Sequence, residues 1–434
     1  MDRPWGLVFI WVLSPLWISL FSGSHLVLGK AELTWTRRAA AEAEAVAAIS
    51  CSGHGMAFVD GVRENGRPVC ECNNCYSGPD CSSSGLIVLL TLLGFGDPLF
   101  LQPYWRRHAE GSAVVISGWH RMSYDADGRP YMTLELERHI RLLHKLVGNA
   151  AAEGKQIVFG AGSTQLLNAA LHALAPDNSS SPSSVVATVP YYPAYQTQTE
   201  YWRSKVFEWK GATAEWLNST EASTKDFIEF VTSPNNPDGR WQAPALAGSS
   251  VIHDRAYYWP HYSAIKSPAD DDLMLFTLSK ITGHAGSRFG WALIKDVKVY
   301  NKILQYIDTD TLGISRETQL RALKVLKQTI SQIKKREDMF RFGYSQMRIG
   351  GLNSTPSSPL PTAFPCRSSP QTYAWVKCER KADEDCSSAI RAGGIIPRAG
   401  TLYGADSRYV RLSLIRSQDD FDQLLTRMKA LTAQ

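Results

Sequence analysis

The segment 276–291 holds the residue types best able to do chemistry. An apolar run leads to Ser279 and Lys280, and a glycine-rich turn then leads to Arg288 and a second apolar run. A lysine at the end of a buried strand is costly unless its amine is neutralised or made covalent, and a Schiff base to an aldehyde cofactor does both. Because Ser279 and Arg288 could hold a phosphate, the segment predicts an enzyme that binds pyridoxal 5'-phosphate (PLP) at Lys280.

A second possible phosphate site lies where a short strand meets a helix. It consists of Gly160, Ala161, Gly162, Ser163 and Thr164. Glycines let the backbone approach an anion, and a helix N-terminus offers N–H donors and the positive end of its dipole. Taken alone, a tight turn explains the pattern about as well, because the loop lacks the lysine of a P-loop and the third glycine of a dinucleotide-binding loop.

Three more predicted strands end in groups that could bind a charged, planar ring. Tyr192 could stack on the ring, and Asn236 could donate to a ring oxygen. Asp254 needs a cationic partner such as a protonated pyridine nitrogen, and Tyr257 could hydrogen-bond the ring hydroxyl. Core packing, an Asn-Pro turn and an internal salt bridge are the alternatives for Tyr192, Asn236 and Asp254. Five signals in order at five strand ends favour one binding site, since ligands of open α/β sheets bind at the carboxyl ends of the strands.

The order of the elements predicts the α/β fold class with a mainly parallel sheet. Apolar residues three and four apart indicate helices, and short apolar runs indicate strands. We expect helices at 42–48, 134–147, 163–174, 297–307, 316–334 and from 419, and strands at 157–160, 185–189, 227–232, 251–253, 273–278, 373–378 and 409–414. The return to strand near the end of the chain predicts a small C-terminal α+β domain.

The N-terminus indicates entry into the secretory pathway. An uncharged apolar stretch follows Arg3, so residues 1–29 are expected to form a signal peptide or a signal-anchor, with 4–21 as the possible membrane anchor. Three glycosylation sequons are consistent with this route, and they begin at Asn178, Asn218 and Asn353.

Composition bounds the class of protein. A chain of 434 residues with 20% charged residues is long enough for two or three globular domains. The net charge of +5 is small for this length and no basic run is present. Composition therefore gives no support for a nucleic-acid partner.

The cysteines are concentrated near the N-terminus. Five of the eight lie between Cys51 and Cys81, in a short stretch that predicts a disulfide-stapled module at 50–82 in an oxidising compartment. A zinc site is the alternative, because Cys72 and Cys75 have the spacing of one ligand pair. No second pair follows nearby, so no metal is expected.

At this point the chain resembles the plant tryptophan aminotransferase-related and alliinase family. The similar segments are WHRMSY (119–124), GAGSTQL (160–166), TSPNNPDG (232–239), HDRAYYWPHY (253–262), SKITGHAGSRFGWALIKD (279–296) and YVRLSL (409–414). The resemblance covers about 35–434. It implies a PLP-dependent aminotransferase fold of type I, with an EGF-like module at 50–82, a PLP-binding large domain at 97–335 and a small domain at 336–434.

The resemblance also implies residue roles. Lys280 would bind PLP covalently and move the Cα proton, Asp254 would hold the pyridine N–H, and Tyr192 would stack on the ring. Tyr257 and Asn236 would bind the ring hydroxyl. The phosphate would be held by Gly160, Ala161, Gly162, Ser163, Thr164, Ser279 and Arg288.

Two implied roles reach beyond one cofactor site. Tyr124 would contact the phosphate bound by a neighbouring subunit, which implies a homodimer with shared active sites. Arg411 would grip the substrate carboxylate with a fork geometry that lysine could not reproduce.

The family pattern implies three disulfides and shows where this chain departs from it. The implied bonds are Cys51–Cys70, Cys72–Cys81 and Cys378–Cys386. Cys75 then lacks its partner and Cys366 is left over. The segments at 82–96 and 342–372 also differ from the family, since the first is apolar where a polar linker is expected and the second is short and rich in Ser and Pro.

The function implied by the resemblance is transamination of L-tryptophan or a related amino acid to a 2-oxo acid of the indole-3-pyruvate type, as in auxin biosynthesis. The alternative is an alliinase-type carbon–sulfur lyase that cleaves S-alkyl-L-cysteine sulfoxides, and a third hypothesis is a non-catalytic member. The cofactor site does not separate the two reactions. Amino and oxo acids are the expected partners, and the endoplasmic reticulum or the vacuole is the expected location.

Overall fold

The protein is described by a computed structural model. It describes residues 34–84, 90–91, 98–126, 129–130, 132–177, 180–220, 225–333, 335, 338–349 and 372–432. The predicted leader at 1–29 with its possible anchor at 4–21, the sequons at Asn178 and Asn353, and Cys366 lie outside these ranges. Within them, no helix combines the length and the apolar character needed to cross a bilayer.

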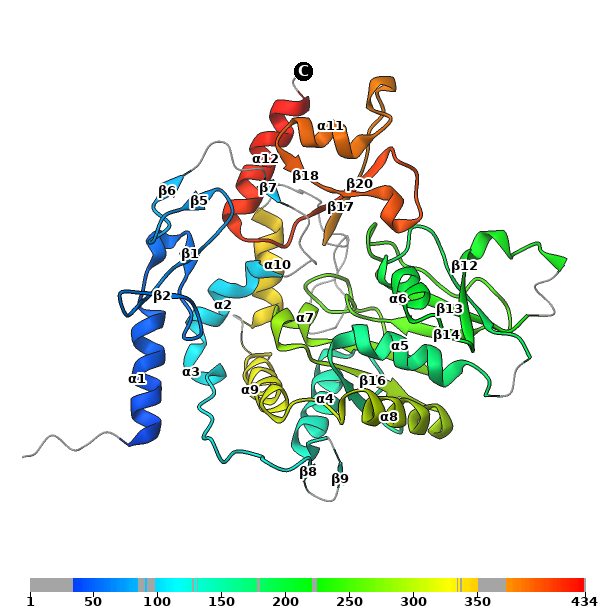
Figure 1. The fold of residues 1–434 in the computed structure, drawn as a ribbon, viewed down its shortest axis with the longest axis horizontal. Coiled ribbons are helices and arrows are strands. Elements are labelled where there is room, and N and C mark those ends of the chain that lie inside the picture. Colours follow the sequence, from blue (N-terminus) through cyan, green and yellow to red (C-terminus); the bar gives the residue numbers. More distant parts are fainter. Residues whose placement is uncertain are drawn as a thin grey trace, which may run out of the picture.

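A seven-stranded sheet forms the centre of the molecule (Figure 1). Its strands, in spatial order, are β10 (Gln156–Gly160), β16 (Gly290–Ile294), β15 (Leu273–Thr277), β14 (Ser250–Asp254), β13 (Phe227–Thr232), β11 (Ser183–Ala187) and β12 (Phe207–Ala212). Within this sheet only the two pairings of β16, with β10 and with β15, are antiparallel. The predicted fold class, an α/β fold with a mainly parallel sheet, is therefore confirmed.

Helices cover both faces of this sheet, which is why its inner strands read as continuous apolar runs. Along β16, Trp291 and Leu293 belong to the core beneath α4 (Leu134–Val147) and α9 (Arg316–Gln332). Ala292 and Ile294 point the other way, to the core beneath α5 (Gly162–Leu174) and α8 (Val297–Thr311). The period of two along a strand thus separates two hydrophobic cores.

The edge of the sheet differs from the prediction. Strand β12 and helix α6 (Ala194–Trp202), which precedes it, were not expected. In β12 only Phe207 is buried, because an edge strand covered on one side needs no continuous apolar run. Short elements elsewhere were also not expected, namely α2 (Gln102–Arg107), α3 (Ala109–Ser112), β8 (Asp125–Ala126) and β9 (Arg129–Pro130).

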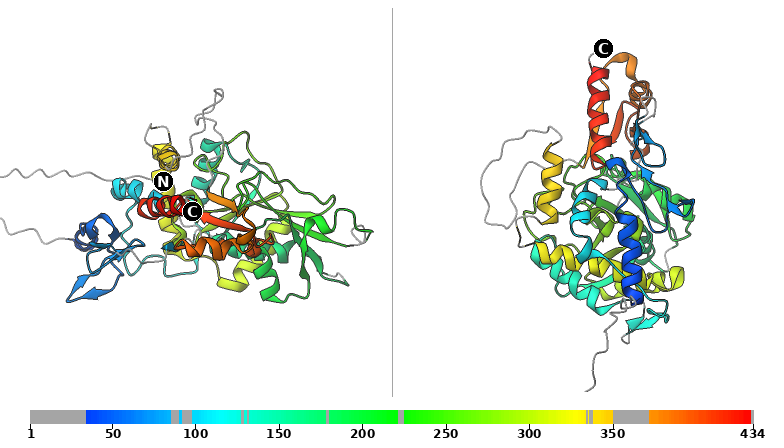
Figure 2. Two further views of the ribbon diagram at one scale, coloured as in Figure 1. Left: turned by 90° about the horizontal axis from the view of Figure 1, so that it is seen from above. Right: turned by 90° about the vertical axis from the view of Figure 1, so that its left-hand side faces the viewer.

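The C-terminal part forms a second, smaller layer beside the carboxyl ends of the sheet (Figures 1 and 2). It contains the antiparallel strands β17 (Tyr373–Lys377), β20 (Tyr409–Ser413) and β19 (Arg398–Ala399), with helices α11 (Cys386–Ala392) and α12 (Gln418–Thr432). Two further short strands, β18 (Ile395–Ile396) and β7 (Leu90–Thr91), pair in parallel. Helix α10 (Met339–Ile349) leads toward this layer. The predicted boundaries at 97–335 and 336–434 stay a prediction.

The cysteine-rich module follows α1 (Trp35–Ala47) and consists of short strand pairs. These are β1 (Gly55–Met56) with β4 (Glu71–Cys72), β2 (Arg63–Glu64) with β3 (Arg67–Pro68), and β5 (Tyr76–Ser77) with β6 (Ser83–Ser84). The structure contains the disulfides Cys51–Cys70, Cys72–Cys81 and Cys378–Cys386. Cys75 is a free, buried thiol. Because Cys72 is bonded to Cys81, it cannot serve as a zinc thiolate.

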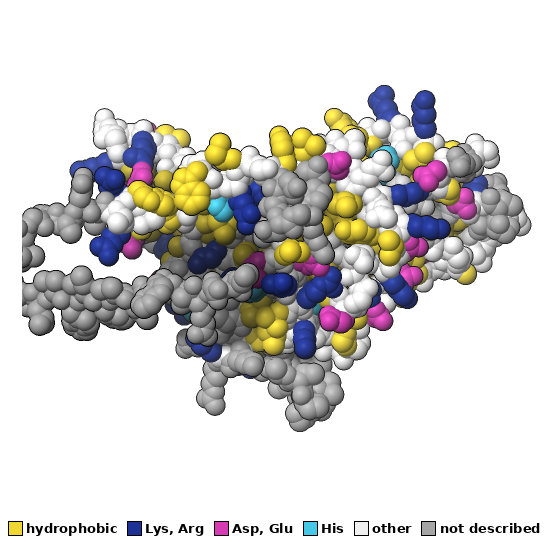
Figure 3. Space-filling model, turned by 90° about the horizontal axis from the view of Figure 1, so that it is seen from below, with side chains coloured by type: hydrophobic (Ala, Val, Ile, Leu, Met, Phe, Trp, Pro, Cys, Tyr) yellow, Lys and Arg dark blue, Asp and Glu magenta, His cyan; other side chains and the backbone are white. Residues whose placement is uncertain are grey.

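One face of the surface is charged with both signs. Figure 3 shows Lys and Arg side chains interspersed with Asp and Glu and with scattered hydrophobic groups. This mixture agrees with the small net charge of +5.

Candidate active site

A cavity of about 630 Å³ lies at the carboxyl ends of the parallel strands. Nine predicted residues line it, namely Ser163, Thr164, Tyr192, Asn236, Asp254, Tyr257, Ser279, Lys280 and Arg288. The structure therefore gathers residues that are more than a hundred positions apart in the chain. It adds wall residues that were not predicted, namely Ala194, Thr232, Ala256, Thr277, Ala285 and Gly286.

One end of the cavity has the features of an anion cradle. Helix α5 begins at Gly162, whose φ of +72° suits glycine. A Cβ at Gly162 would lie 2.5 Å from the Arg288 side chain, so a larger residue would fill the space between the helix N-terminus and the guanidinium. Ser163 was expected to start the helix, but Ala161 is the N-cap and Ser163 lies in the first turn, on the cavity wall.

The side chains at this end are positioned by the turn after β15. Arg288 is exposed, and its guanidinium donates to the carbonyls of Ala285, at 3.0 Å, and Ala161, at 3.3 Å. The Thr277 hydroxyl caps α7 (Leu278–Ile281) by accepting from the Ser279 amide at 3.2 Å. An arginine, a serine hydroxyl and a helix N-terminus in one place fit a phosphate group.

The cavity wall also contains a buried carboxylate. Asp254 is the last residue of β14, and its Oδ2 accepts a hydrogen bond from the Tyr195 hydroxyl at 2.8 Å. Its Oδ1 accepts from the Ala256 amide at 3.0 Å. Burial raises the pKa of Asp254, while these hydrogen bonds and the charge of Lys280 act in the opposite direction. A buried carboxylate that faces a cavity fits a cationic ring nitrogen.

Lys280 lines the same cavity. It was expected at the end of a strand, but it belongs to the short helix α7, one turn beyond β15. The Lys280 ammonium is 5.7 Å from the centre of the Tyr257 ring, and its main-chain carbonyl accepts from the Tyr262 hydroxyl at 3.0 Å. The Tyr257 hydroxyl in turn lies 2.6 Å from that of Tyr373. An amine, a phosphate cradle and a carboxylate around one cavity fit PLP.

Arg411 approaches the cavity from β20 but is not one of its wall residues. It is 1% exposed, and its Nη1 donates to Asn236 Oδ1 at 3.1 Å. Its guanidinium carbon is 4.0 Å from the centre of the Tyr373 ring. Asn236 therefore links Arg411 to the cavity wall.

The three remaining predicted residues differ in position. Gly160 and Ala161 are not wall residues and lie at the end of β10 and at the N-cap of α5. Tyr124 lies outside the cavity with 68% of its surface exposed, and its carbonyl accepts from Arg316. Its predicted contact with a neighbouring subunit stays a prediction.

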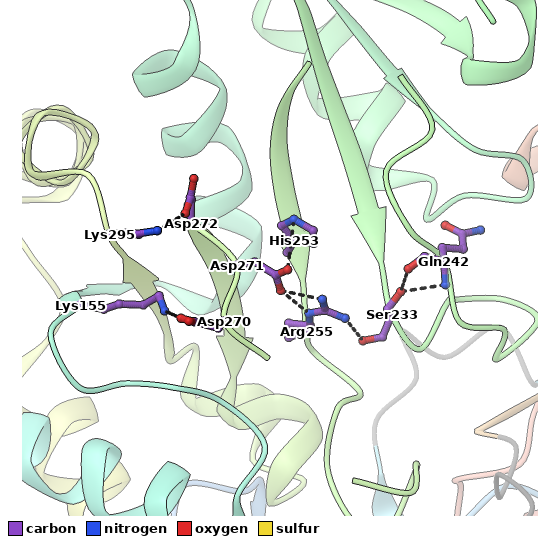
Figure 4. A network of polar contacts seen from close by, with 9 residues as sticks. All are labelled: Lys155, Ser233, Gln242, His253, Arg255, Asp270, Asp271, Asp272 and Lys295. Atoms are coloured by element: carbon purple, nitrogen blue, oxygen red, sulfur yellow. Dashed lines mark hydrogen bonds and ion pairs between the residues drawn. The ribbon is translucent and has the colours of Figure 1, made fainter. Parts of the chain in front are cut away.

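A polar network around Arg255, the residue after Asp254, was not predicted from the sequence (Figure 4). The Arg255 guanidinium donates to Asp271 Oδ2 at 2.6 and 3.2 Å and to the Ser233 carbonyl at 3.4 Å. It thereby joins the turn after β13, the end of β14 and the loop that enters β15. Successive side chains along a strand point to opposite faces, so the sequence could have predicted that Arg255 points away from Asp254.

The sequence is similar to those of known proteins. Residues 92–351 and 364–432 match the family described as Allinase, and residues 34–85 match the Alliinase EGF-like domain. The chain is 50% identical to tryptophan aminotransferase-related protein 3 of Arabidopsis thaliana, over 92% of this chain and 91% of that protein. It is 46% identical to alliin lyase of Allium cepa var. aggregatum, over 93% and 95%.

Solved structures share the fold. Aspartate aminotransferase from Thermus thermophilus with maleate superposes with a TM-score of 0.54, covering 80% of this chain and 92% of that chain at 16% identity. A substrate-bound BacF structure from Bacillus subtilis gives a TM-score of 0.57, covering 80% and 90% at the same identity. At this level of identity the likeness concerns the aminotransferase-like fold alone.

Proposed function

The chain belongs to the alliinase and tryptophan aminotransferase-related family, and from this premise we propose that it is an aminotransferase that converts L-tryptophan or a related amino acid to its 2-oxo acid. The family and the fold imply a PLP-dependent enzyme, either an aminotransferase or a carbon–sulfur lyase. The observation that carries the proposal is one cavity whose wall contains Lys280, Arg288 and Asp254 together.

Different residues of the cavity wall would hold different parts of PLP. Ser279, Arg288 and the N-terminus of α5 would hold its phosphate, and Asp254 would keep its ring nitrogen protonated. When bound there, PLP supplies an aldehyde that links to an amine and a cationic ring that accepts electrons from Cα. Tyr192 would pack on the ring.

The chain's own residues perform the proton transfer and the substrate binding. The Lys280 amine would remove the proton from Cα of the substrate and later return one. Arg411 would hold the substrate carboxylate and so fix which bond at Cα faces Lys280. Asn236 and Tyr373, which contact Arg411, would keep its guanidinium in place.

The choice of transamination rests on similarity. The Arabidopsis relative named for tryptophan aminotransferase is 50% identical, and the alliin lyase from Allium cepa var. aggregatum is 46% identical. The alternative, cleavage of S-alkyl-L-cysteine sulfoxides by β-elimination, is favoured by the match to the alliinase EGF-like domain. Both reactions begin with the same removal of the Cα proton.

The setting of the enzyme is part of the proposal. Three disulfides favour an oxidising compartment of the secretory pathway, the endoplasmic reticulum or the vacuole. By its resemblance to the family, the enzyme would be a homodimer in which the exposed Tyr124 reaches the site of the neighbouring subunit.

Two incubations of the purified protein with PLP test the proposed reaction. The first contains L-tryptophan and a 2-oxo acid acceptor, and the second an S-alkyl-L-cysteine sulfoxide. We expect an indole-bearing oxo acid in the first and no pyruvate in the second. Pyruvate and ammonia from the sulfoxide, without oxo acid from tryptophan, would replace the proposal by the lyase. A protein inactive in both incubations would count against either reaction.

A further inference from the structure

A hydroxyl behind the cavity holds the Asp254 carboxylate. Tyr195 lies in the first turn of α6 and is 1% exposed. Its hydroxyl donates to Asp254 Oδ2 at 2.8 Å. Its ring stacks on Phe230 of β13, with the centroids 4.2 Å apart and the planes 5° from parallel. The stacking thus holds the Tyr195 oxygen in place beside Asp254.

A second hydroxyl continues the chain of hydrogen bonds to the cavity wall. The Thr232 Oγ1 lies 2.5 Å from the Tyr195 oxygen, and Thr232 lines the cavity. A tyrosine hydroxyl has one proton. Since Tyr195 gives this proton to Asp254, Thr232 must donate to Tyr195. The direction of the chain is therefore Thr232 to Tyr195 to Asp254, and it ends on the carboxylate.

We propose that Tyr195 is a positioning residue, which holds Asp254 ionised and oriented so that the carboxylate can keep the ring nitrogen of the cofactor protonated. The inference rests on the proposed function, because it concerns the PLP site. A buried carboxylate tends to take up a proton, and hydrogen bonds to its charged form oppose this, as does a nearby positive charge. Donors arranged in series strengthen one another, so Thr232 contributes through Tyr195.

Replacement of the hydroxyl without loss of the ring tests the inference. Tyr195→Phe keeps the stacking on Phe230 and removes the donor. We expect PLP affinity at neutral pH to fall by about 10- to 100-fold, the range for one hydrogen bond to a charged group. The acid limb of PLP binding should also move to higher pH by about one unit or more, because Asp254 then takes up a proton more readily.

The control variant removes a hydroxyl elsewhere in the large domain. Tyr306 in α8 accepts a hydrogen bond from Asn168 and does not line the cavity. Tyr306→Phe should leave PLP affinity and its pH dependence unchanged. Loss of stability of the cofactor-free protein, measured by urea unfolding, would accompany a purely structural role of Tyr195, but it would not shift the acid limb.

Thr232 provides a second, independent variant. Thr232→Val should lower PLP affinity in the same direction but less, and Thr232→Ser, which keeps the hydroxyl, should restore it. In the Tyr195→Phe background, Thr232→Val should have no further effect on affinity, since the chain is already broken. If the two changes lowered PLP affinity by fully additive amounts, the series of hydrogen bonds from Thr232 through Tyr195 to Asp254 would be contradicted.

The outcomes separate this inference from the proposed function. If the wild-type protein binds no PLP, as judged by visible absorbance of the mixture, the proposed function fails and the inference with it. If the wild type binds PLP and Tyr195→Phe matches it in both affinity and pH dependence, the inference alone is wrong.

Discussion

The consequences of burial are clearest at Asp254. Its side chain turns toward the cavity and receives hydrogen bonds from Tyr195 and Ala256, whereas that of Arg255 turns the opposite way onto Asp271. Burial raises the pKa of Asp254, so its charged form is stabilised less than it would be in water. A cationic ligand in the cavity would offset this cost.

Asp254→Asn therefore separates stability from binding. We expect the cofactor-free variant to be at least as stable as the wild type at neutral pH, because a desolvated charge has been removed. PLP affinity should fall by about 100-fold, since the amide offers the ring nitrogen no charge. Urea unfolding and titration with PLP measure the two quantities. A variant with unchanged affinity would contradict the role given to Asp254.

At the scale of elements, the start of α5 shapes the part of the cavity that we propose binds the phosphate. Gly290 at the start of β16 belongs to the same arrangement, because a Cβ there would lie 2.8 Å from the Gly162 carbonyl carbon and the Ser163 nitrogen. Small residues in both elements let the strand approach the helix N-terminus. The turn after β15 then brings Arg288 to the same point.

Gly162→Ala tests this packing, and the chain offers a matched control. Gly162 and Gly148 have nearly the same φ, +72° and +73°, so alanine at either position should cost about 1 kcal/mol of backbone strain. Only at Gly162 would the new Cβ meet Arg288, since a Cβ built at Gly148 would meet no other group within 4 Å. We expect about tenfold weaker PLP binding from Gly162→Ala alone. Equal losses of PLP affinity in the two variants would contradict the proposal that the phosphate binds between Gly162 and Arg288.

A buried histidine couples α4 to the sheet and makes stability depend on pH. His144 accepts from the Trp291 indole at 2.9 Å and contacts Asn149 at 2.9 Å. Burial lowers the pKa of His144 to about 4, below its value of 6.5 in the unfolded chain. The stabilisation from the neutral ring is therefore complete above pH 6.5 and is lost as the pH falls toward 4.

His144→Gln should remove this dependence. Between pH 7 and pH 5 we expect the wild type to lose about 2 kcal/mol more unfolding free energy than the variant. Urea unfolding at the two pH values gives both differences. Identical pH dependence in the two proteins would show that His144 does not titrate on unfolding.

The elements that the sequence predicted are those in which burial or hydrophobic periodicity is uniform along the whole element. The buried strands and the amphipathic α4 were predicted because burial or periodicity is uniform in them. The edge strand β12 lacks this uniformity, and the turn that moves Lys280 from a strand to α7 depends on the Thr277 cap. Tyr195 was missed as a partner of Asp254 because their contact spans 59 positions and depends on the packing of α6.

At the scale of the whole molecule, the cysteine-rich module is joined to the C-terminal layer. Asp419, in the first turn of α12, accepts from Asn73 at 2.8 Å and lies 3.1 Å from the His54 ring nitrogen. The Cys75 side chain belongs to the apolar cluster of Ile390, Ile395, Val410, Leu412 and Leu424. The module therefore shares a core with the part of the chain that carries Arg411.

Asp419→Ala should loosen this junction. Burial protects the Cys75 thiol and raises its pKa, so labelling by a thiol reagent is slow in the wild type. Removal of both hydrogen bonds is expected to increase the rate of this labelling. Mass spectrometry locates the label. Asp422→Ala, on the exposed side of the same helix, should leave the rate unchanged. Equal rates in the two variants would mean that the junction does not depend on Asp419.

The central claim is that Lys280 is the residue to which PLP is linked. Reduction of the PLP-treated protein with borohydride, followed by peptide mass spectrometry, tests it directly. We predict a pyridoxyl-phosphate adduct on the peptide containing Lys280, and its absence from that peptide in Lys280→Ala. An adduct confined to a different lysine, or a wild-type protein that takes up no adduct, would contradict the account.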